Sequence, residues 1–200
     1  MIFEDRIHAG KLLAKKIKEE KIDFSIVLGI LRGGIIVAKE ISKEFNKKLL
    51  PIIARKLRVP FEEELAFGAI CEDVIIFNED VIRSFGITKE QIEKEIEYQK
   101  KIIEERKKVF GNEYTKLKSE KVLLVDDGIA TGATVKAAAY YLAKNNEVII
   151  ASPVIAYETF LEISKEFKIV AVEIAKYMPA IGMFYKDFKE VKDEEILKIL

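Results

Sequence analysis

Two adjacent aspartates at the end of an apolar run carry the clearest chemical signal in this sequence. Asp126 and Asp127 follow Val122–Val125, and a turn of mostly small residues, Gly128–Thr134, comes next. Ligands of open α/β sheets bind at the carboxyl ends of strands, where these two acids are expected. Two neighbouring ionised carboxylates repel each other, so the pair favours a ligand that bonds both. The vicinal hydroxyls of a ribose meet this requirement, with Mg²⁺ nearby.

The turn after the acids has the composition of a phosphate-binding loop. Ala130, Thr131, Gly132, Ala133 and Thr134 lead into a helical pattern. Small residues let backbone N–H groups close on a phosphate, and a helix N-terminus favours its negative charge. The loop has neither Walker A nor GxGxxG spacing. The alternative is an ordinary strand–turn–helix with solvated acids, which makes the acid pair, the glycine spacing and both threonines coincidental.

A second glycine turn follows the first predicted strand. Arg32, Gly33 and Gly34 come directly after the apolar stretch 24–30 and Leu31. A guanidinium can bind a diphosphate through two hydrogen bonds, and glycines permit close approach of the backbone. Alone this turn is weak evidence, because a simple tight turn explains it equally well. Together with the acid pair it indicates a site with two anion-binding ends.

These motifs resemble those of one enzyme family. The stretch VLLVDDGIATGAT is similar to the phosphoribosyl-pyrophosphate signature of type I phosphoribosyltransferases, and Arg32–Gly34 is similar to their pyrophosphate loop. The resemblance implies that Asp126 and Asp127 hold the ribose 2- and 3-hydroxyls, and that residues 130–134 hold the 5-phosphate. It implies that Arg32, Gly33 and Gly34 bind the pyrophosphate, and that the two acids and Arg32 form the catalytic set. In some relatives the peptide before the basic residue is cis.

The resemblance also suggests a lid and a base-binding hood. A mobile loop closes over the reaction in this family, which implies that Lys56 and Arg58 reach the pyrophosphate from 55–69. A solvated charged loop is the alternative. In the hood, at 177–188, Tyr177, Met178 and Tyr185 would hold the base by stacking on it. Ordinary packing of an aromatic C-terminus is the alternative there. The ligands implied for Mg²⁺ are Asp126, Asp127 and Asp187.

The resemblance covers nearly the whole chain and is strongest to a group of predicted phosphoribosyltransferases of unassigned substrate. Shared stretches include FEDRIHAGKLLA, RKLRVPFEEELAFGAI and FYKDFKEVKDEEI. It implies transfer of 5-phosphoribosyl from 5-phosphoribosyl 1-pyrophosphate to a nitrogenous base, in a homodimer. Ala130 stands where hypoxanthine-type relatives carry an aspartate, which argues against their mechanism. The alternatives are a non-catalytic phosphoribosyl pyrophosphate or nucleotide sensor that regulates a partner such as RNA, and a nucleotide phosphatase or phosphorylase.

Composition limits the other classes. With 34 basic and 34 acidic residues the chain has no global basic surface, so a nucleic-acid partner is not expected. The single Cys71 excludes an internal disulfide and a cysteine-based zinc site, and we expect it to be buried. His8 is expected on the surface, away from the motifs. The first residues lack a long apolar run, so no signal peptide or membrane span is expected, and the expected compartment is the cytoplasm.

Alternating strands and helices predict how these motifs are positioned. We expect an α/β fold of type I phosphoribosyltransferase kind, with a mainly parallel sheet, helices on both faces, a small hood and an extra long helix. Residues 1–200 would form one domain with an insert at 55–112. Predicted strands are 24–30, 49–54, 74–77, 122–125, 148–154 and 169–174. Predicted helices are 5–20, 35–45, 88–109, 134–143, 160–166 and 193–200.

The insert is the least regular part of the pattern. The stretch 55–73 is expected to be a loop followed by some strand. Thr88 and Gln91 form a capping box for the long helix. Its thin apolar stripe suggests packing on the parent domain, with a dimer contact as the alternative. The stripe consists of Ile92, Ile96, Ile103 and Phe110.

Overall fold

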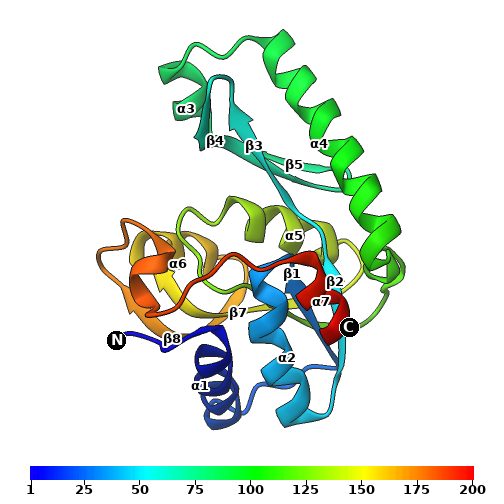
Figure 1. The fold of residues 1–200 in the computed structure, drawn as a ribbon, viewed down its shortest axis with the longest axis vertical. Coiled ribbons are helices and arrows are strands. Elements are labelled where there is room, and N and C mark those ends of the chain that lie inside the picture. The colour runs from blue at the N-terminus through cyan, green and yellow to red at the C-terminus, as the bar shows by residue number, and fades with distance from the viewer.

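A parallel five-stranded sheet forms the centre of the molecule in the computed structural model, which describes all residues 1–200 (Figure 1). The strand order is β2-β1-β6-β7-β8. Their bounds are β1 Ile26–Ile30, β2 Lys48–Ile52, β6 Lys121–Val125, β7 Glu147–Ala156 and β8 Lys168–Ala175. All four pairings are parallel, as the alternation of strands and helices predicted.

Helices cover both faces of this sheet, which is why its strands are apolar on both sides. On one face, α1 (Arg6–Glu19) and α2 (Gly33–Phe45) pack against Val27, Leu123 and Ala151. On the other face, α5 (Ala133–Ala143) and α6 (Tyr157–Ile163) pack against strand residues such as Leu28, Leu124 and Ile150. The predicted α/β class with helices on both faces is confirmed.

The insert forms an arm that projects from the carboxyl edge of the sheet (Figure 1). It contains an antiparallel sheet of β3 (Arg55–Val59), β4 (Glu62–Cys71) and β5 (Val74–Phe77), and two helices, α3 (Glu79–Ser84) and α4 (Lys89–Phe110). The prediction that the insert opens with a loop is wrong, because residues 55–71 are a β-hairpin. The sequence RKLRV alternates with period two: Leu57 and Val59 are buried, whereas Lys56 and Arg58 are exposed.

The long helix α4 begins as predicted. The Thr88 side chain accepts from the Gln91 N–H, and the Gln91 side chain accepts from the Thr88 N–H, which completes the capping box. Ile103 and Phe110 are buried, and Ile92 and Ile96 pack against the large core cluster. The apolar stripe therefore packs on the parent chain, as expected. Cys71 is buried at the end of β4, also as expected.

The C-terminal segment returns to the sheet edge. After β8 it forms a 3-10 turn, η2 (Ile181–Phe184), and a short helix, α7 (Asp193–Ile199). Elsewhere in the chain, a 3-10 turn, η1 (Glu113–Lys116), precedes β6. Val191 and Ile196 bury themselves against Ile35 of α2 and Phe110 of α4. This packing fixes the tail beside the amino end of α2 (Figure 1). None of the helices has the length and apolar character needed to cross a membrane.

Candidate active site

The two predicted motifs meet at the carboxyl edge because their strands are neighbours. β1 pairs with β6 in register, so Gly29 lies opposite Val125 and the segments that follow lie side by side. The approach is close enough to require glycine. A Cβ on Gly33 would lie 2.1 Å from Asp127 Oδ2, and one on Gly34 would lie 2.7 Å from the Val125 carbonyl oxygen. The acid pair and the Arg-Gly-Gly turn therefore form one site.

The two acids have different surroundings. Arg6 Nε donates to Asp127 Oδ2 over 2.7 Å, and both side chains are nearly buried. The Arg6 guanidinium lies 3.9 Å above the centre of the Phe188 ring and donates to the Lys189 carbonyl. Asp126 has no cation at ion-pair distance, and its Oδ1 accepts from the Asp127 N–H at 2.9 Å. Of the two acids, only Asp127 has a counter-charge, that of Arg6, at ion-pair distance.

Burial makes this asymmetry matter for ionisation. Burial and the neighbouring charge of Asp127 raise the pKa of Asp126 well above that of an ordinary aspartate. Burial also raises the pKa of Asp127, but the charge and hydrogen bond of Arg6 oppose that rise. In this coupled pair Asp126 therefore holds a proton more readily than Asp127 does.

The predicted phosphate loop leads into α5 as expected. Gly132 precedes the helix with φ +79°, a left-handed conformation that favours glycine, and no side chain caps the first helical N–H groups. Ile129 is anchored to β7 by backbone hydrogen bonds to Val154 and from Ala156. Thr159 donates to the Ala130 carbonyl at 2.5 Å, which fixes the start of the loop. Thr131 is exposed at the mouth of this turn.

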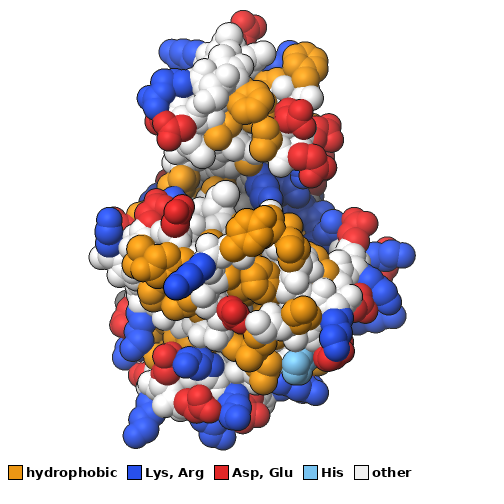
Figure 2. All heavy atoms as spheres, turned by 90° about the vertical axis from the view of Figure 1, so that its left-hand side faces the viewer, with side chains coloured by type: hydrophobic (Ala, Val, Ile, Leu, Met, Phe, Trp, Pro, Cys, Tyr) orange, Lys and Arg blue, Asp and Glu red, His pale blue; other side chains and the backbone are white.

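Basic side chains gather where the arm joins the sheet edge. The Leu31–Arg32 peptide is cis. Burial and the nearby charges of Arg106, Arg58 and Arg32 lower the pKa of Arg55, so each of these three arginines lies within Coulombic range of Arg55. Lys56 lies near enough to Asp126 to favour its ionised form. Figure 2 shows Lys and Arg side chains concentrated at the neck between the arm and the core.

The three predicted base-binding residues of the hood differ in their exposure. Tyr177 is 77% exposed and stays available to a ligand. Met178 is partly buried against a small apolar cluster. Tyr185 does not fit its predicted role: its ring is buried between Phe3 and Phe188, and its hydroxyl donates to the Asp127 carbonyl at 2.5 Å. Tyr185 instead helps to hold the backbone of Asp127 in place.

The predicted metal ligands do not form one cluster. No three His, Cys, Asp or Glu side chains come together in a way that could hold a metal. Asp187 is exposed and forms an ion pair with Lys189, 3.5 Å away, so it is not grouped with Asp126 and Asp127. His8 is a structural residue outside the acid pair, since its Nδ1 accepts from the Glu4 N–H.

Three arginines of this site were not predicted from the sequence. Arg6 reaches Asp127 across 121 positions of the chain, and Arg106 lies near the C-terminal end of a helix rich in charged residues. Arg55 donates to Gln99 of α4 at 3.1 Å, and Gln99 is fully buried. The available signal was the spacing of Gln99, seven residues after Ile92 and four before Ile103 on the apolar face of α4, but its partner depends on how the arm folds.

Two hollows elsewhere on the surface lack such convergent groups. One, of about 460 Å³, lies at the amino ends of β6 and β7 and is lined by 119–121 and 143–147. The other lies between Glu72 and α4. Neither lies at the carboxyl edge of the parallel sheet, where ligands of such sheets bind.

Comparison with known proteins identifies the family and agrees with the fold. The family model described as a phosphoribosyl transferase domain matches residues 3–175. The chain is 33% identical to two Mycobacterium tuberculosis proteins, from strains CDC 1551 / Oshkosh and ATCC 25618 / H37Rv, that are provisionally named phosphoribosyl transferases. The alignment covers all of this chain but 46% of each relative, so the chain spans about half their length.

Solved structures give the same result. The chain is similar to the protein TT1426 from Thermus thermophilus, with 31% identity, a TM-score of 0.77 and coverage of 100% of this chain and 97% of that one. It shares the fold of a purine phosphoribosyltransferase from Pyrococcus horikoshii, at 17% identity, a TM-score of 0.51 and coverage of 96% and 99%. The chain has the type I phosphoribosyltransferase fold and belongs to the phosphoribosyl transferase domain family.

Proposed function

We propose that the chain transfers a 5-phosphoribosyl group from 5-phosphoribosyl 1-pyrophosphate to a nitrogenous base and releases pyrophosphate. The observation that carries this proposal is the contact between Gly33 and Asp127, where a Cβ would lie 2.1 Å from the carboxylate. It brings an anion-binding turn and a pair of hydroxyl-binding acids to one place. A ligand with a ribose between two phosphate groups matches that arrangement.

Each part of the site has a role in this reaction. The N–H groups of 130–134 would bind the 5-phosphate, helped by the hydroxyls of Thr131 and Thr134. Asp126 and Asp127 would accept hydrogen bonds from the ribose hydroxyls and fix C1. A base nitrogen then supplies the electron pair for the new bond to C1, and the bond from C1 to the diphosphate oxygen breaks. The transition state would be oxocarbenium-like, by analogy with glycosyl transfer.

Charge develops on the departing diphosphate, and the basic side chains at the neck are placed to stabilise it. Arg32 follows β1, while Lys56 and Arg58 extend from the exposed face of β3. Positive groups fixed in advance, in a site partly shielded from water, lower the barrier more than mobile ones. Lys56 and Arg58 lie on a strand, so closure would involve movement of the arm rather than of a loop.

The donor set fits a magnesium ion that enters with its substrate. Mg²⁺ is commonly held by one or two carboxylates together with phosphate oxygens. Asp126 lacks a cationic partner, which leaves its carboxylate available; Asp127 is partly committed to Arg6. Bound Mg²⁺ would neutralise charge on the diphosphate. Asp187 would reach it only after releasing Lys189.

The acceptor is proposed only as a class. Tyr177 and Met178 follow the carboxyl end of β8, on the same edge of the sheet as the acid pair, and offer an exposed ring and a thioether that suit a flat base. Ala130 carries no carboxylate, so this position supplies no general base. A homodimer remains part of the proposal by analogy with the family.

The experiment is a pyrophosphate-release assay with 5-phosphoribosyl 1-pyrophosphate, Mg²⁺ and a panel of purine, pyrimidine and non-standard bases. We expect release with at least one base and none with Asp126→Asn/Asp127→Asn. Binding of the donor without release for any base would support a non-catalytic sensor instead. Release of inorganic phosphate in place of pyrophosphate would indicate a phosphatase.

A further inference from the structure

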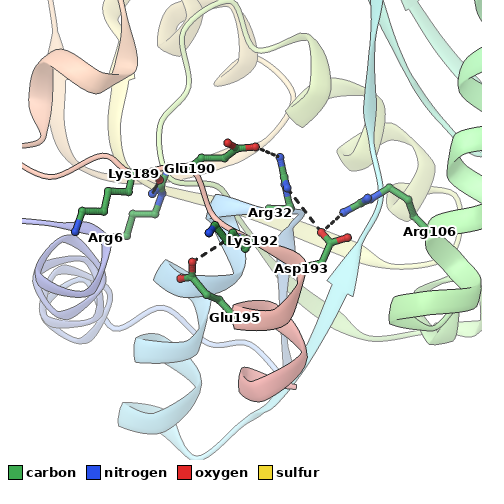
Figure 3. A network of polar contacts seen from close by, with 8 residues as sticks. All are labelled: Arg6, Arg32, Arg106, Lys189, Glu190, Lys192, Asp193 and Glu195. Atoms are coloured by element: carbon green, nitrogen blue, oxygen red, sulfur yellow. Dashed lines mark hydrogen bonds and ion pairs between the residues drawn. The ribbon is translucent and has the colours of Figure 1, made fainter.

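Arg32 is paired with the C-terminal tail. Its guanidinium nitrogens lie 3.2 Å from Glu190 Oε1 and 3.8 Å from Asp193 Oδ1. Arg106 of α4 donates to the same Asp193 oxygen at 2.9 Å. Figure 3 shows the two guanidiniums pointing at Asp193 from opposite sides. One carboxylate oxygen therefore joins the turn after β1 to the arm.

The tail supplies two carboxylates, Glu190 and Asp193, against the arginines at the neck, so positive charge is left over. Burial lowers the pKa of Arg55, and the nearby charges of Arg106, Arg58 and Arg32 lower it further. Arg55 has the neutral Gln99 as its hydrogen-bond partner. Glu190 and Asp193 are 78% and 39% exposed, so water can replace them at small cost. A diphosphate carries more charge than one carboxylate and can accept from several guanidinium groups.

We propose that Arg106 is a diphosphate-binding residue that acts with Arg32, and that the Asp193 carboxylate occupies their shared site in the free protein. This inference rests on the proposed function and adds two roles to it. The arm contributes a ligand-binding side chain from α4. The tail acts as a built-in competitor, held in place by the packing of Val191 and Ile196 against Ile35.

A purely structural role for Arg106 makes the opposite prediction. If Arg106 only fastens the tail, then Arg106→Gln and Asp193→Asn both loosen the tail. In that case neither variant weakens the binding of an anion at Arg32; each strengthens it or leaves it unchanged. If Arg106 binds diphosphate, Asp193→Asn strengthens binding and Arg106→Gln weakens it. The sign of the effect separates the two roles.

The test is isothermal titration of the full chain with inorganic pyrophosphate, with and without Mg²⁺. We expect Asp193→Asn to tighten binding several-fold and Arg106→Gln to weaken it about tenfold or more, as for a lost charge-assisted hydrogen bond. In the Asp193→Asn background, Arg106→Gln should still weaken binding. Arg106→Lys keeps the charge without the planar fork and should give an intermediate affinity.

Arg83→Gln is the matched control, because Arg83 pairs with Asp80 on α3 at the outer end of the arm. It should leave affinity unchanged; a loss equal to that of Arg106→Gln would mean that net charge alone matters and would overturn the proposal. So would tighter or unaltered binding in Arg106→Gln, or no pyrophosphate binding by the wild type. Thermal melts identify unfolded variants, and the Arg106→Lys titration then decides. Pyrophosphate binding without phosphoribosyl transfer would refute only the proposed reaction.

Discussion

Arg6 Nε and Asp127 Oδ2 lie 2.7 Å apart, whereas Asp126, one residue earlier, has no cationic partner. The two adjacent acids therefore differ in how they are held. Asp127 is anchored by Arg6, which stacks on Phe188, and its carbonyl accepts from the buried Tyr185. Asp126 has only the Asp127 N–H as a hydrogen-bond donor, so its carboxyl group remains available to a ligand.

Asp126→Asn should stabilise the fold and weaken donor binding. The raised pKa means that the folded state holds the proton of Asp126 more tightly than the unfolded state does. Stability therefore falls as pH rises from the ordinary aspartate range, about 4, toward the raised value, and an amide removes this loss. We expect a gain on the order of 1 kcal/mol at pH 7, or about 2–4 °C in melting temperature. The gain should vanish near pH 4, and a lower melting temperature at pH 7 would contradict it.

Asp127→Asn should stabilise the fold less than Asp126→Asn does. It leaves the nearly buried Arg6 guanidinium facing a neutral amide, and this loss of the counter-charge offsets the relief of removing a buried carboxylate whose pKa is raised. We expect a smaller gain in unfolding free energy than for Asp126→Asn, measured by urea unfolding of both variants at pH 7. Arg6→Met should instead cost about 1–3 kcal/mol, because it leaves Asp127 buried without its counter-charge. Equal effects of Asp126→Asn and Asp127→Asn would refute the asymmetry.

How far the sequence predicts this site depends on the range of the contacts. The parallel sheet, α4 with its capping box, and the loop before α5 follow from local patterns: apolar runs, Thr88 with Gln91, and Gly132. Arg6 and Arg106 could not be assigned in this way, because their partners Asp127 and Asp193 are far away in the chain.

Two wrong predictions have identifiable physical causes. The sequence predicts a loop in place of the β3–β4 hairpin because its charged residues outweigh the alternation that places Leu57 and Val59 inside. It predicts a base-binding ring at Tyr185 because aromatic residues suit both stacking on a ligand and packing in a core. The burial of Tyr185 between Phe3 and Phe188 decides for packing, and this contact depends on the tertiary fold.

Gly33→Ala tests the contact between the two motifs. Its Cβ would lie 2.1 Å from Asp127 Oδ2 and 2.8 Å from Arg6 Nε, so the turn or the ion pair must shift. We expect a loss of about 1–3 kcal/mol in stability and of donor binding in titrations. Gly182→Ala is the control, because its nearest neighbour beyond the adjacent residues is a Phe188 ring carbon at 3.3 Å. Wild-type affinity in Gly33→Ala would show that the two segments are not in contact.

Lys107 gives a test of how the arm is fastened to its own sheet. Burial disfavours its charge, but hydrogen bonds to Glu72 and Glu104 outweigh burial and raise the pKa of Lys107. A raised lysine pKa stabilises the fold below the unfolded value, about 10.4, and this contribution is lost as pH rises through the folded value. Lys107→Met should therefore lower the unfolding free energy at pH 8, by about 1 kcal/mol. The difference should shrink as pH rises above the unfolded value; a constant difference would contradict the assignment.

Isothermal titration of the wild-type chain with 5-phosphoribosyl 1-pyrophosphate and Mg²⁺ tests the central claim most directly. We predict saturable binding of one donor per chain, with binding strongly weakened in Asp126→Asn/Asp127→Asn and retained in Arg83→Gln. Absence of binding by the wild type, or equal binding by the double variant, would contradict the proposed donor site.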